Sequence, residues 1–231
     1  PKSPDATASA DQPAVDKQRV RAVWLVCLVS IVFWLTALQS GSSLALFAEQ
    51  NTLHTLWLGH RQLIIGPGHF AALHALLVAV LMPILIAGAA GLRRRALEPS
   101  TPAKMIWGYL LTAAAFAILI WAAVRGSAIG RVSPVWLGGS YVILSAAELL
   151  LAPLGMALVT QLAPVAKRSQ AVGLWFAATA AGNLLTGALG ILWVRWPHPW
   201  YFALLSFLSL AAAFVLLAQL RQLKIAIHHV G

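Results

Sequence analysis

Six long apolar runs constrain the fold of this chain more than any other feature of its sequence. They cover approximately residues 21–47, 69–91, 105–124, 134–162, 170–194 and 199–220. About 20 helical residues cross the hydrocarbon core of a bilayer, whereas a barrel strand needs about 9 to 11 residues with strict alternation. The runs are too long and too uniformly apolar for strands. We therefore predict an all-α integral membrane protein with six transmembrane helices.

The overall composition agrees with a membrane protein and excludes other classes. Hydrophobic residues make up 60% of the chain and charged residues 10%, whereas charged residues are about 25% of a soluble protein. The net charge of +10 comes from lysine and arginine at the edges of the apolar runs, without an aromatic-interleaved patch, so we expect no nucleic-acid partner. The single cysteine, Cys27, excludes an internal disulfide and a cysteine metal cluster, and we expect no metal and no cofactor.

Lysine and arginine also predict the topology. If the N-terminus is cytoplasmic, twelve of the 16 basic residues lie in inner loops and tails, and the outer loops hold only Arg61, Arg125, Arg131 and Arg195. Cytoplasmic loops of membrane proteins carry such an excess of positive charge. We therefore predict that both termini are cytoplasmic.

The two ends of the chain differ from its apolar middle. Residues 1–19 are rich in proline, alanine and aspartate and begin without methionine or a signal peptide, so we expect a flexible linker and a longer parent polypeptide. Residues 20–221 are expected to form the six-helix membrane unit, and residues 222–231 a cytoplasmic tail.

Glu148 is an acid deep inside the fourth apolar run. A charge at the bilayer centre costs about 2.5 to 3.5 kcal/mol on insertion scales, so this group must be neutral, paired or in contact with water. Desolvation favours the neutral acid, and a nearby cation or ligand amine favours the carboxylate, so that a proton can be exchanged for a substrate contact. The alternative interpretation is a packing hydrogen bond made by a permanently protonated acid.

Prolines interrupt two of the predicted helices. Pro83 lies in the second run and Pro153 in the fourth, five residues after Glu148. Each removes a backbone hydrogen bond, and we expect each to kink its helix. The kink at Pro153 would open backbone carbonyl groups close to the acid.

Other polar residues have two interpretations each. Gln39 and three serines between residues 40 and 43 form either a water-lined face or an interhelical hydrogen-bond site. His74 and Asn183 are either packing residues or ligands, and Glu49 is either a solvated outer acid or a functional one. No second intramembrane acid accompanies Glu148 and no zinc-protease spacing occurs, so we predict that the protein is not an enzyme.

A small-residue pattern recurs in the fifth run. Ala178, Gly182, Thr186 and Gly190 follow one another every four residues. Such a face lets another helix approach closely. We therefore predict helix packing there rather than ligand contact.

Four segments of the chain resemble the carboxy-terminal half of the proton-dependent oligopeptide transporters, a family of the major facilitator superfamily. They are FWLTALQSGSSLALFAEQNT, RRRALEPSTPAKMIWGYLL, SPVWLGGSYVILSAAELLLAPLGMALVTQLAP and AVGLWFAATAAGNLLTGAL. Their order fits helices seven to twelve of that family over residues 20–220. The most diagnostic part is the pattern of Glu148, Leu149, Pro153 and Gly155.

The resemblance implies one half of a bacterial inner-membrane symporter that moves di- and tripeptides with protons by alternating access. It implies that Glu148 faces the central cavity, binds the peptide amino terminus, exchanges protons and pairs with a lysine of the other half. It implies that Glu49 closes the outer gate against an arginine of the first helix. Trp175 and Asn183 match cavity-side or packing positions, and we include both in the expected substrate-binding set with Glu148.

The same set includes Gln39 and His74, and here the chain departs from the family. His74 stands near the place of an asparagine that contacts peptide, and Ala152 replaces a serine that usually precedes the proline. The acid and arginine motif of the family's first helix has no counterpart. We therefore expect the amino-terminal half in the same gene, in a separate chain or mimicked by a homodimer. The alternatives are a non-transporting binding or assembly module, or a facilitator for a different small solute.

Overall fold

The computed structural model describes residues 4–228, and six of its helices are long and apolar enough to cross a membrane. The elements are α1 (Pro4–Ala37), η1 (Leu38–Gly41), α2 (Ser43–Asn51), β1 (Thr55–Leu58), β2 (Arg61–Ile64), α3 (Pro67–Arg94), α4 (Thr101–Ile129), α5 (Pro134–Leu162), η2 (Val165–Lys167), α6 (Arg168–Arg195), α7 (His198–Ala218) and α8 (Leu220–His228). The spans lie in α1 with α2, and in α3, α4, α5, α6 and α7. The six predicted transmembrane helices are thus confirmed.

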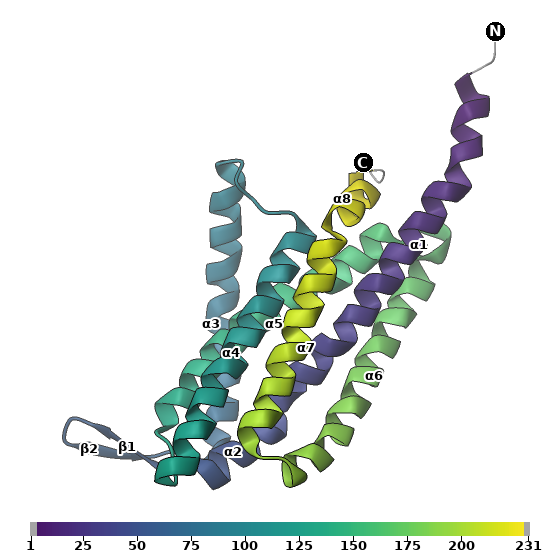
Figure 1. Cartoon of the computed structure of the whole chain (residues 1–231). Coiled ribbons are helices and arrows are strands. Elements are labelled where there is room, and N and C mark those ends of the chain that lie inside the picture. Colours follow the sequence, from purple (N-terminus) through teal and green to yellow (C-terminus); the bar gives the residue numbers. More distant parts are fainter. Residues whose placement is uncertain (1–3, 229–231) are drawn as a thin grey trace.

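The long helices run side by side, and the chain returns to the end where it starts (Figure 1). The N- and C-terminal labels and the α3–α4 connection lie at that same end. An even number of spans requires both ends of the unit on one side of a membrane. The assignment of that side to the cytoplasm remains a prediction.

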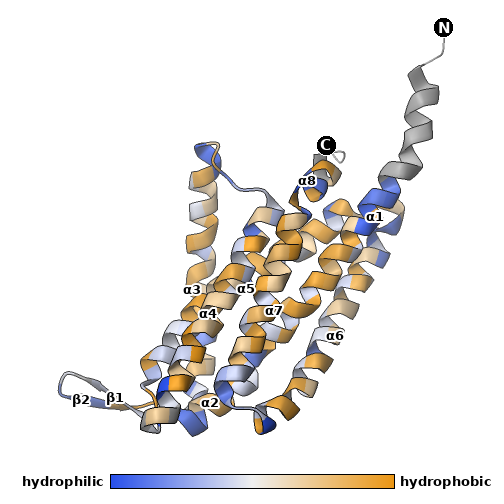
Figure 2. Cartoon of the chain, viewed as in Figure 1, coloured by the Kyte–Doolittle hydropathy of each residue, from blue (hydrophilic) through white to orange (hydrophobic). Residues whose placement is uncertain are grey.

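Apolar residues make up most of the long helices, as the colouring of Figure 2 shows, and many large apolar side chains are exposed. Leu184 and Val194 on α6 are 77% and 83% exposed. In water such a surface would be unfavourable, whereas the hydrocarbon core of a bilayer would cover it. The outer surface therefore agrees with a membrane environment.

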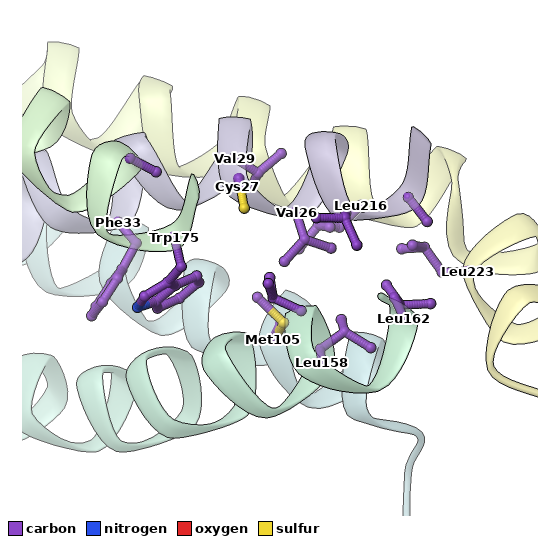
Figure 3. Close-up of a cluster of buried hydrophobic side chains, with 14 of the residues drawn as sticks. Val26, Cys27, Val29, Phe33, Met105, Leu158, Leu162, Trp175, Leu216 and Leu223 are labelled. Carbon is purple, nitrogen blue, oxygen red and sulfur yellow. The ribbon is translucent and has the colours of Figure 1, made fainter. Parts of the chain in front are cut away.

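The interior at the end that holds the termini is an apolar cluster built by α1, α4, α5, α6, α7 and α8 (Figure 3). Two glycines let the helices approach closely. A Cβ atom on Gly182 of α6 would lie 2.6 Å from the Cβ atom of Trp34 on α1, and one on Gly155 of α5 would lie 2.5 Å from the ring of Trp175. Helix packing by the small face of α6 is confirmed at Ala178, Gly182 and Thr186, which are buried.

Gly190 is the exception in that pattern, because it is exposed and nothing lies near the place of a Cβ atom. The close contact of α6 with α1 therefore ends before the last turn of the small-residue pattern.

Arg19 ties the beginning of the α1 span to the end of α5. Its Nε atom donates to the Leu162 carbonyl oxygen at 3.0 Å, and its Nη2 atom donates to the Ala163 carbonyl oxygen at 3.3 Å. The last carbonyl groups of a helix have no intrahelical donor, and a basic side chain can supply one. Arg19 therefore supplies hydrogen-bond donors to the last carbonyl groups of α5 at the place where α1 and α5 meet.

Helix α3 is the least enclosed of the spans. Only 6% of its most apolar 18-residue window is buried, against 50% for the span in α4. Its main contacts are with α5 and with the short helix α2. Figure 1 accordingly shows α3 at the margin of the bundle.

Two prolines lie inside long helices without ending them. Pro83 is part of α3 and Pro153 part of α5, and both helices continue on either side. The kinks expected at these residues remain predictions.

A short β-hairpin joins α2 to α3, where the sequence analysis expected no strands. Strands β1 and β2 pair antiparallel around Gly59 and His60. Gly59 has a φ of +61°, and glycine at the first position of a two-residue turn is typical of the II′ hairpin. Neither TLWL nor RQLI alternates polar and apolar residues, so no periodic strand signal was present between the two helices.

The ends of the unit are more helical than expected. Helix α1 begins at Pro4, within the segment 1–19 that was expected to be a flexible linker. Alanine-rich sequence has high helix propensity, and extension of a helix that is already nucleated adds one bond per residue. At the other end α8 extends into the segment expected as a tail, and its Leu223 and Ala226 join the apolar cluster. Residues 1–3 and 229–231 lie outside the described residues.

Candidate functional site

Three polar side chains of α5 lie on one face of that helix. Tyr141, Ser145 and Glu148 are spaced by four and three residues, which places them one above the other in successive turns. Ser145 is fully buried, whereas the Glu148 side chain is one-third exposed. Glu148 thus lies at the border between the packed interior and the open side of the bundle.

His74 of α3 is the partner of Glu148. Its Nε2 atom lies 3.1 Å from the Glu148 Oε2 atom, and its Nδ1 atom lies 2.9 Å from the Ser145 Oγ atom. The resemblance implied a lysine of the other half as the partner of this acid, and that pairing remains a prediction. Within this chain the fold brings in His74, which lies 71 residues before Ser145 in the sequence.

Tyr141 holds α3 in the position that this contact requires. The Phe70 ring stacks on the Tyr141 ring with centroids 5.8 Å apart, and the His74 ring meets the same ring edge-on at 5.9 Å. The Tyr141 hydroxyl donates to the Ser40 carbonyl oxygen at 2.8 Å. One tyrosine therefore connects α5 with α3 and with the end of α1.

A small cavity of about 10 Å³ adjoins the pair. It is lined by residues of α1, η1, α3, α4 and α5, namely Phe33, Thr36, Ala37, Ser40, His74, Thr112, Leu144 and Glu148. This space holds about one water molecule. The cavity is too small for a dipeptide. His74 and Glu148 therefore lie on one side of a possible ligand site and do not enclose a ligand within this chain.

Gln39 does not reach this wall. It is completely buried, its Nε2 atom donates to the Leu35 carbonyl oxygen, and its Oε1 atom accepts from Ser43 at 2.6 Å and from Tyr201 at 2.7 Å. Of the two interpretations of the 39–43 segment, the interhelical hydrogen-bond site is the one observed. Both ends of the Gln39 amide are thus bonded within this chain, and the inclusion of Gln39 in the substrate-binding set remains a prediction.

Trp175 and Asn183 lie on different sides of α6. Trp175 is buried, packs on Gly155 and meets Trp34 edge-on with centroids 6.4 Å apart. It packs here beside the turn of α5 that contains Pro153, and its place in the substrate-binding set remains a prediction. Asn183 is exposed, and its contact with a substrate remains a prediction.

Glu49 lies far from the pair, on α2. Its side chain is 60% exposed, and the closest cation is the His54 ring, whose Nε2 atom lies 4.0 Å from the Glu49 Oε2 atom. The side chain is free to meet a further chain or solvent. Its role in an outer gate remains a prediction.

Sequence reasoning missed Ser145 and Tyr141, although a signal for both was present. Their spacing from Glu148 repeats the helical period, so that a tyrosine, a serine and an acid share one stripe of an otherwise apolar helix. Among residues 4–228, no group of three or more histidine, cysteine, aspartate or glutamate side chains comes together that could hold a metal ion.

Comparison with known proteins gives a consistent result. The model of the POT family matches residues 6–198. The peptide transporter YePEPT of Yersinia enterocolitica is 35% identical over 184 residues, which are 74% of this chain and 34% of that protein. A di-/tripeptide transporter of Lactococcus lactis is 28% identical over 203 residues, which are 87% of this chain and 40% of that protein.

A solved structure shows the same fold. The crystal structure of a peptide transporter POT in complex with sulfate superposes with a TM-score of 0.81 at 27% identity, over 92% of this chain and 42% of that one. The chain thus spans well under half the length of the relatives that it matches.

Proposed function

Because this chain belongs to the POT family, we propose that it forms the carboxy-terminal six-helix half of a proton-coupled symporter of di- and tripeptides. Two similar proteins are described as a peptide transporter and a di-/tripeptide transporter. The observation that carries the proposal is the Glu148 carboxyl group, which lies inside a membrane-spanning helix on an open wall of the bundle. Intramembrane acids in such positions mark substrate pathways and proton relays.

The chemistry of Glu148 suits the amino terminus of a peptide. A carboxylate in a medium of low dielectric attracts an ammonium group more strongly than in water. When no ammonium group is present, a proton or a neighbouring cation balances the same charge. A peptide amino group and a proton can therefore alternate at Glu148.

The substrate also needs a second wall. The cavity beside Glu148 has a volume of about 10 Å³, whereas carriers of this type enclose the substrate at the bilayer midplane between two halves that rock around it. We propose that an amino-terminal half covers the open sides of α3 and α5. Glu49 would then close the outer gate against an arginine of that half, and Asn183 would face the shared interior.

The remaining features follow from the bacterial relatives and the charge distribution. We propose a location in the bacterial inner membrane with both termini cytoplasmic, since the basic residues gather in the loops at that end. The lipid bilayer, the peptide, protons and the amino-terminal half are the expected partners.

The direct test is uptake by the reconstituted pair of halves. This chain is co-expressed with the amino-terminal half of a family member, and dipeptide uptake into proteoliposomes is measured with and without an inward proton gradient. We expect uptake only with both halves and only with the gradient. Inserted, folded protein without uptake above background would contradict the proposal and would favour a non-transporting membrane module.

A further inference from the structure

A hollow of about 630 Å³ lies between the beginning of α1 and the junction of α7 with α8. Among the described residues that line it, every polar side chain carries hydrogen-bond donors and none is acidic. These side chains are Lys17, Gln18 and Arg21 of α1, Gln219 at the end of α7 and Gln222 of α8. The hollow shares no residue with the small cavity beside the intramembrane acid. It is therefore a separate, positively charged place on the bundle.

The two cations of the hollow have no counter-charge in the described part of the chain. Lys17 and Arg21 are four residues apart, so they lie on the same face of α1, and both side chains are exposed. Neither has a carboxylate within 4.0 Å among residues 4–228. The neighbouring acid, Asp16, lies 4.0 Å from the Arg19 Nη1 atom. Arg19 thus serves helix packing, whereas the charges of Lys17 and Arg21 remain available to a ligand.

The hollow lies at the level where the membrane-spanning segments end. The first span begins at Asp16 and the last one ends at Ala218, so Lys17 is the second residue of the first span and Gln219 directly follows the last. The headgroup layer on each side of the hydrocarbon core is about 5 to 8 Å thick. Lys17 and Arg21 are about 6 Å apart along the helix axis. The two cations therefore cover the layer in which lipid phosphate groups lie.

The rest of the lining is apolar. Ala22 and Leu25 of α1 and Leu223 of α8 complete it. Ala22 and Leu223 are buried and belong to the apolar cluster of which Figure 3 shows a part. Leu25 lies one helical turn further into the span than Arg21. A ligand that contacts both parts of the hollow must therefore combine an anionic head with an apolar chain.

The donors of the hollow suit a phosphate group in particular. A guanidinium group such as that of Arg21 can donate two parallel hydrogen bonds to phosphate oxygens, and a lysine ammonium group adds a point charge. Glutamine amides donate as well. A choline headgroup would bring a third positive charge beside Lys17 and Arg21. The hollow should therefore discriminate in favour of phospholipids with a net negative charge.

We propose that this hollow binds the headgroup phosphate of one anionic phospholipid. Lys17 and Arg21 supply the cations, the amides of Gln219 and Gln222 supply further donors, and the first part of an acyl chain lies along the apolar lining. Basic pockets between transmembrane helices bind anionic headgroups in this way. The bound phosphate joins α1 to α8, which are the first and last helices of the chain. Binding of the lipid does not depend on the proposed function, since it requires no peptide.

Native mass spectrometry of the full chain, released from detergent, tests the lipid directly. The protein is titrated with phosphatidylglycerol and, separately, with phosphatidylcholine that has the same acyl chains. Bound lipids are counted at each concentration. Each cation near the phosphate is worth about fivefold in affinity, so we expect one phosphatidylglycerol with a preference of about 10- to 30-fold over phosphatidylcholine. Equal binding of the two lipids would overturn the proposal.

A double substitution separates this site from a general attraction of the positive surface. Lys17→Gln together with Arg21→Gln should lower the affinity for phosphatidylglycerol about 10- to 30-fold. The matched control is Arg94→Gln with Arg95→Gln, which removes two exposed cations at the end of α3, on the same side of the bundle (Figure 1). It should keep the affinity within about twofold. Equal losses in both double variants would refute a specific site.

A single substitution decides the question even if the double variant does not fold. Gln222→Glu keeps both cations of α1 and places a carboxylate at an exposed position of the hollow. The affinity for phosphatidylglycerol should fall about fivefold or more, because the added charge repels the phosphate. Gln62→Glu makes the same chemical change on β2, at the other end of the bundle (Figure 1), and should have no effect. Wild-type affinity in Gln222→Glu would contradict the proposal.

Two other occupants of the hollow would give different results. Inorganic phosphate at millimolar concentration should not displace fluorescently labelled phosphatidylglycerol, because it makes no contact with the apolar lining. Displacement would identify a site for soluble anions. The chain assembled with the amino-terminal half of a family member should keep the bound lipid. Loss of the lipid on assembly would mean that the other half covers the hollow, and either result would overturn the proposal.

Discussion

Glu98 and Glu148 have basic partners that differ in kind. Glu98, in the connection between α3 and α4, has the Arg93 Nε atom 2.7 Å from its Oε2 atom and the Lys104 ammonium group at its other oxygen. Among the described residues, Glu148, within a span, has the His74 ring at 3.1 Å as its basic partner. The loop acid is held by two permanent cations and the membrane acid by one imidazole ring.

This difference separates a structural acid from one that can do chemistry. Hydrogen bonds from Arg93 and Lys104 lower the pKa of Glu98 to about 2, so its charge is constant at physiological pH. The contact of His74 with Glu148 lies inside the membrane-spanning part and contains no permanent cation.

The largest effect is expected from neutralising each acid in turn. Glu148→Gln in the assembled transporter should lower proton-driven dipeptide uptake about 30-fold or more, because loss of one partner of a buried charge pair costs about 2 kcal/mol or more. Glu98→Gln is the matched control and should leave uptake within about two-fold, since exposed ion pairs contribute little. Full uptake by Glu148→Gln would remove the distinction between the two acids.

A smaller effect is expected from Ser145→Ala, which keeps His74 and Glu148 but removes the hydroxyl group that bonds to the His74 Nδ1 atom. A lost hydrogen bond of this kind is worth about 0.5 to 1.5 kcal/mol, so dipeptide uptake should fall about three- to tenfold.

Ser209→Ala serves as the control for this variant. Its hydroxyl group bonds only to the Leu205 carbonyl oxygen of its own helix, at 2.9 Å. It should leave dipeptide uptake unchanged. Equal losses in both variants would show a general effect of serine removal and not an effect on His74.

Tyr201→Phe examines a buried polar contact that contains no charge at all. The Tyr201 hydroxyl donates to the Gln39 Oε1 atom at 2.7 Å, and its loss should lower the free energy of unfolding by about 0.5 to 1.5 kcal/mol. Thermal unfolding in detergent should show the same loss at every pH between about 5 and 8, the interval in which histidine titrates. A loss that varies with pH in this interval would mean that the Gln39 network is coupled to a titrating group.

The smallest effect is expected from acid titration of Glu98. Its folded-state pKa of about 2 lies below the ordinary value of 4.5, so its ion pairs stabilise the folded chain above about pH 4.5 and lose this effect as the pH falls toward 2. The difference in Tm between wild type and Glu98→Gln should therefore shrink over this interval. A difference that stays constant with pH would contradict the assignment of Glu98 as the titrating acid.

Hydropathy predicted the membrane fold well because each span is a local feature. About 20 apolar residues in succession define a span without knowledge of its neighbours. The hairpin of β1 and β2 was missed because four-residue strands between long helices carry little signal. The first turns of α1, after Pro4, were expected as a linker because the prediction used the amino-acid composition of that segment and did not consider its helix propensity.

The site was only partly predictable, since its geometry depends on contacts between helices. The cost of burying a charge singles out Glu148 from the sequence alone. Nothing in the spacing of α3 and α5 indicates that His74 meets it, because hydropathy does not define which faces of two helices touch. The hydrogen bond of Gln39 with Tyr201 was not predictable for the same reason, since Tyr201 lies on a helix far along the chain.

Helix α3 is attached to the bundle mainly through α5 and α2, and one of its contacts joins His74 to the intramembrane acid. Phe70 contributes an apolar ring that stacks on Tyr141, and His74 contributes the polar link to Glu148 and Ser145. The acid proposed to bind substrate is therefore also an anchor of the least enclosed span. Any change at this single carboxyl group would alter how firmly a whole transmembrane segment is held.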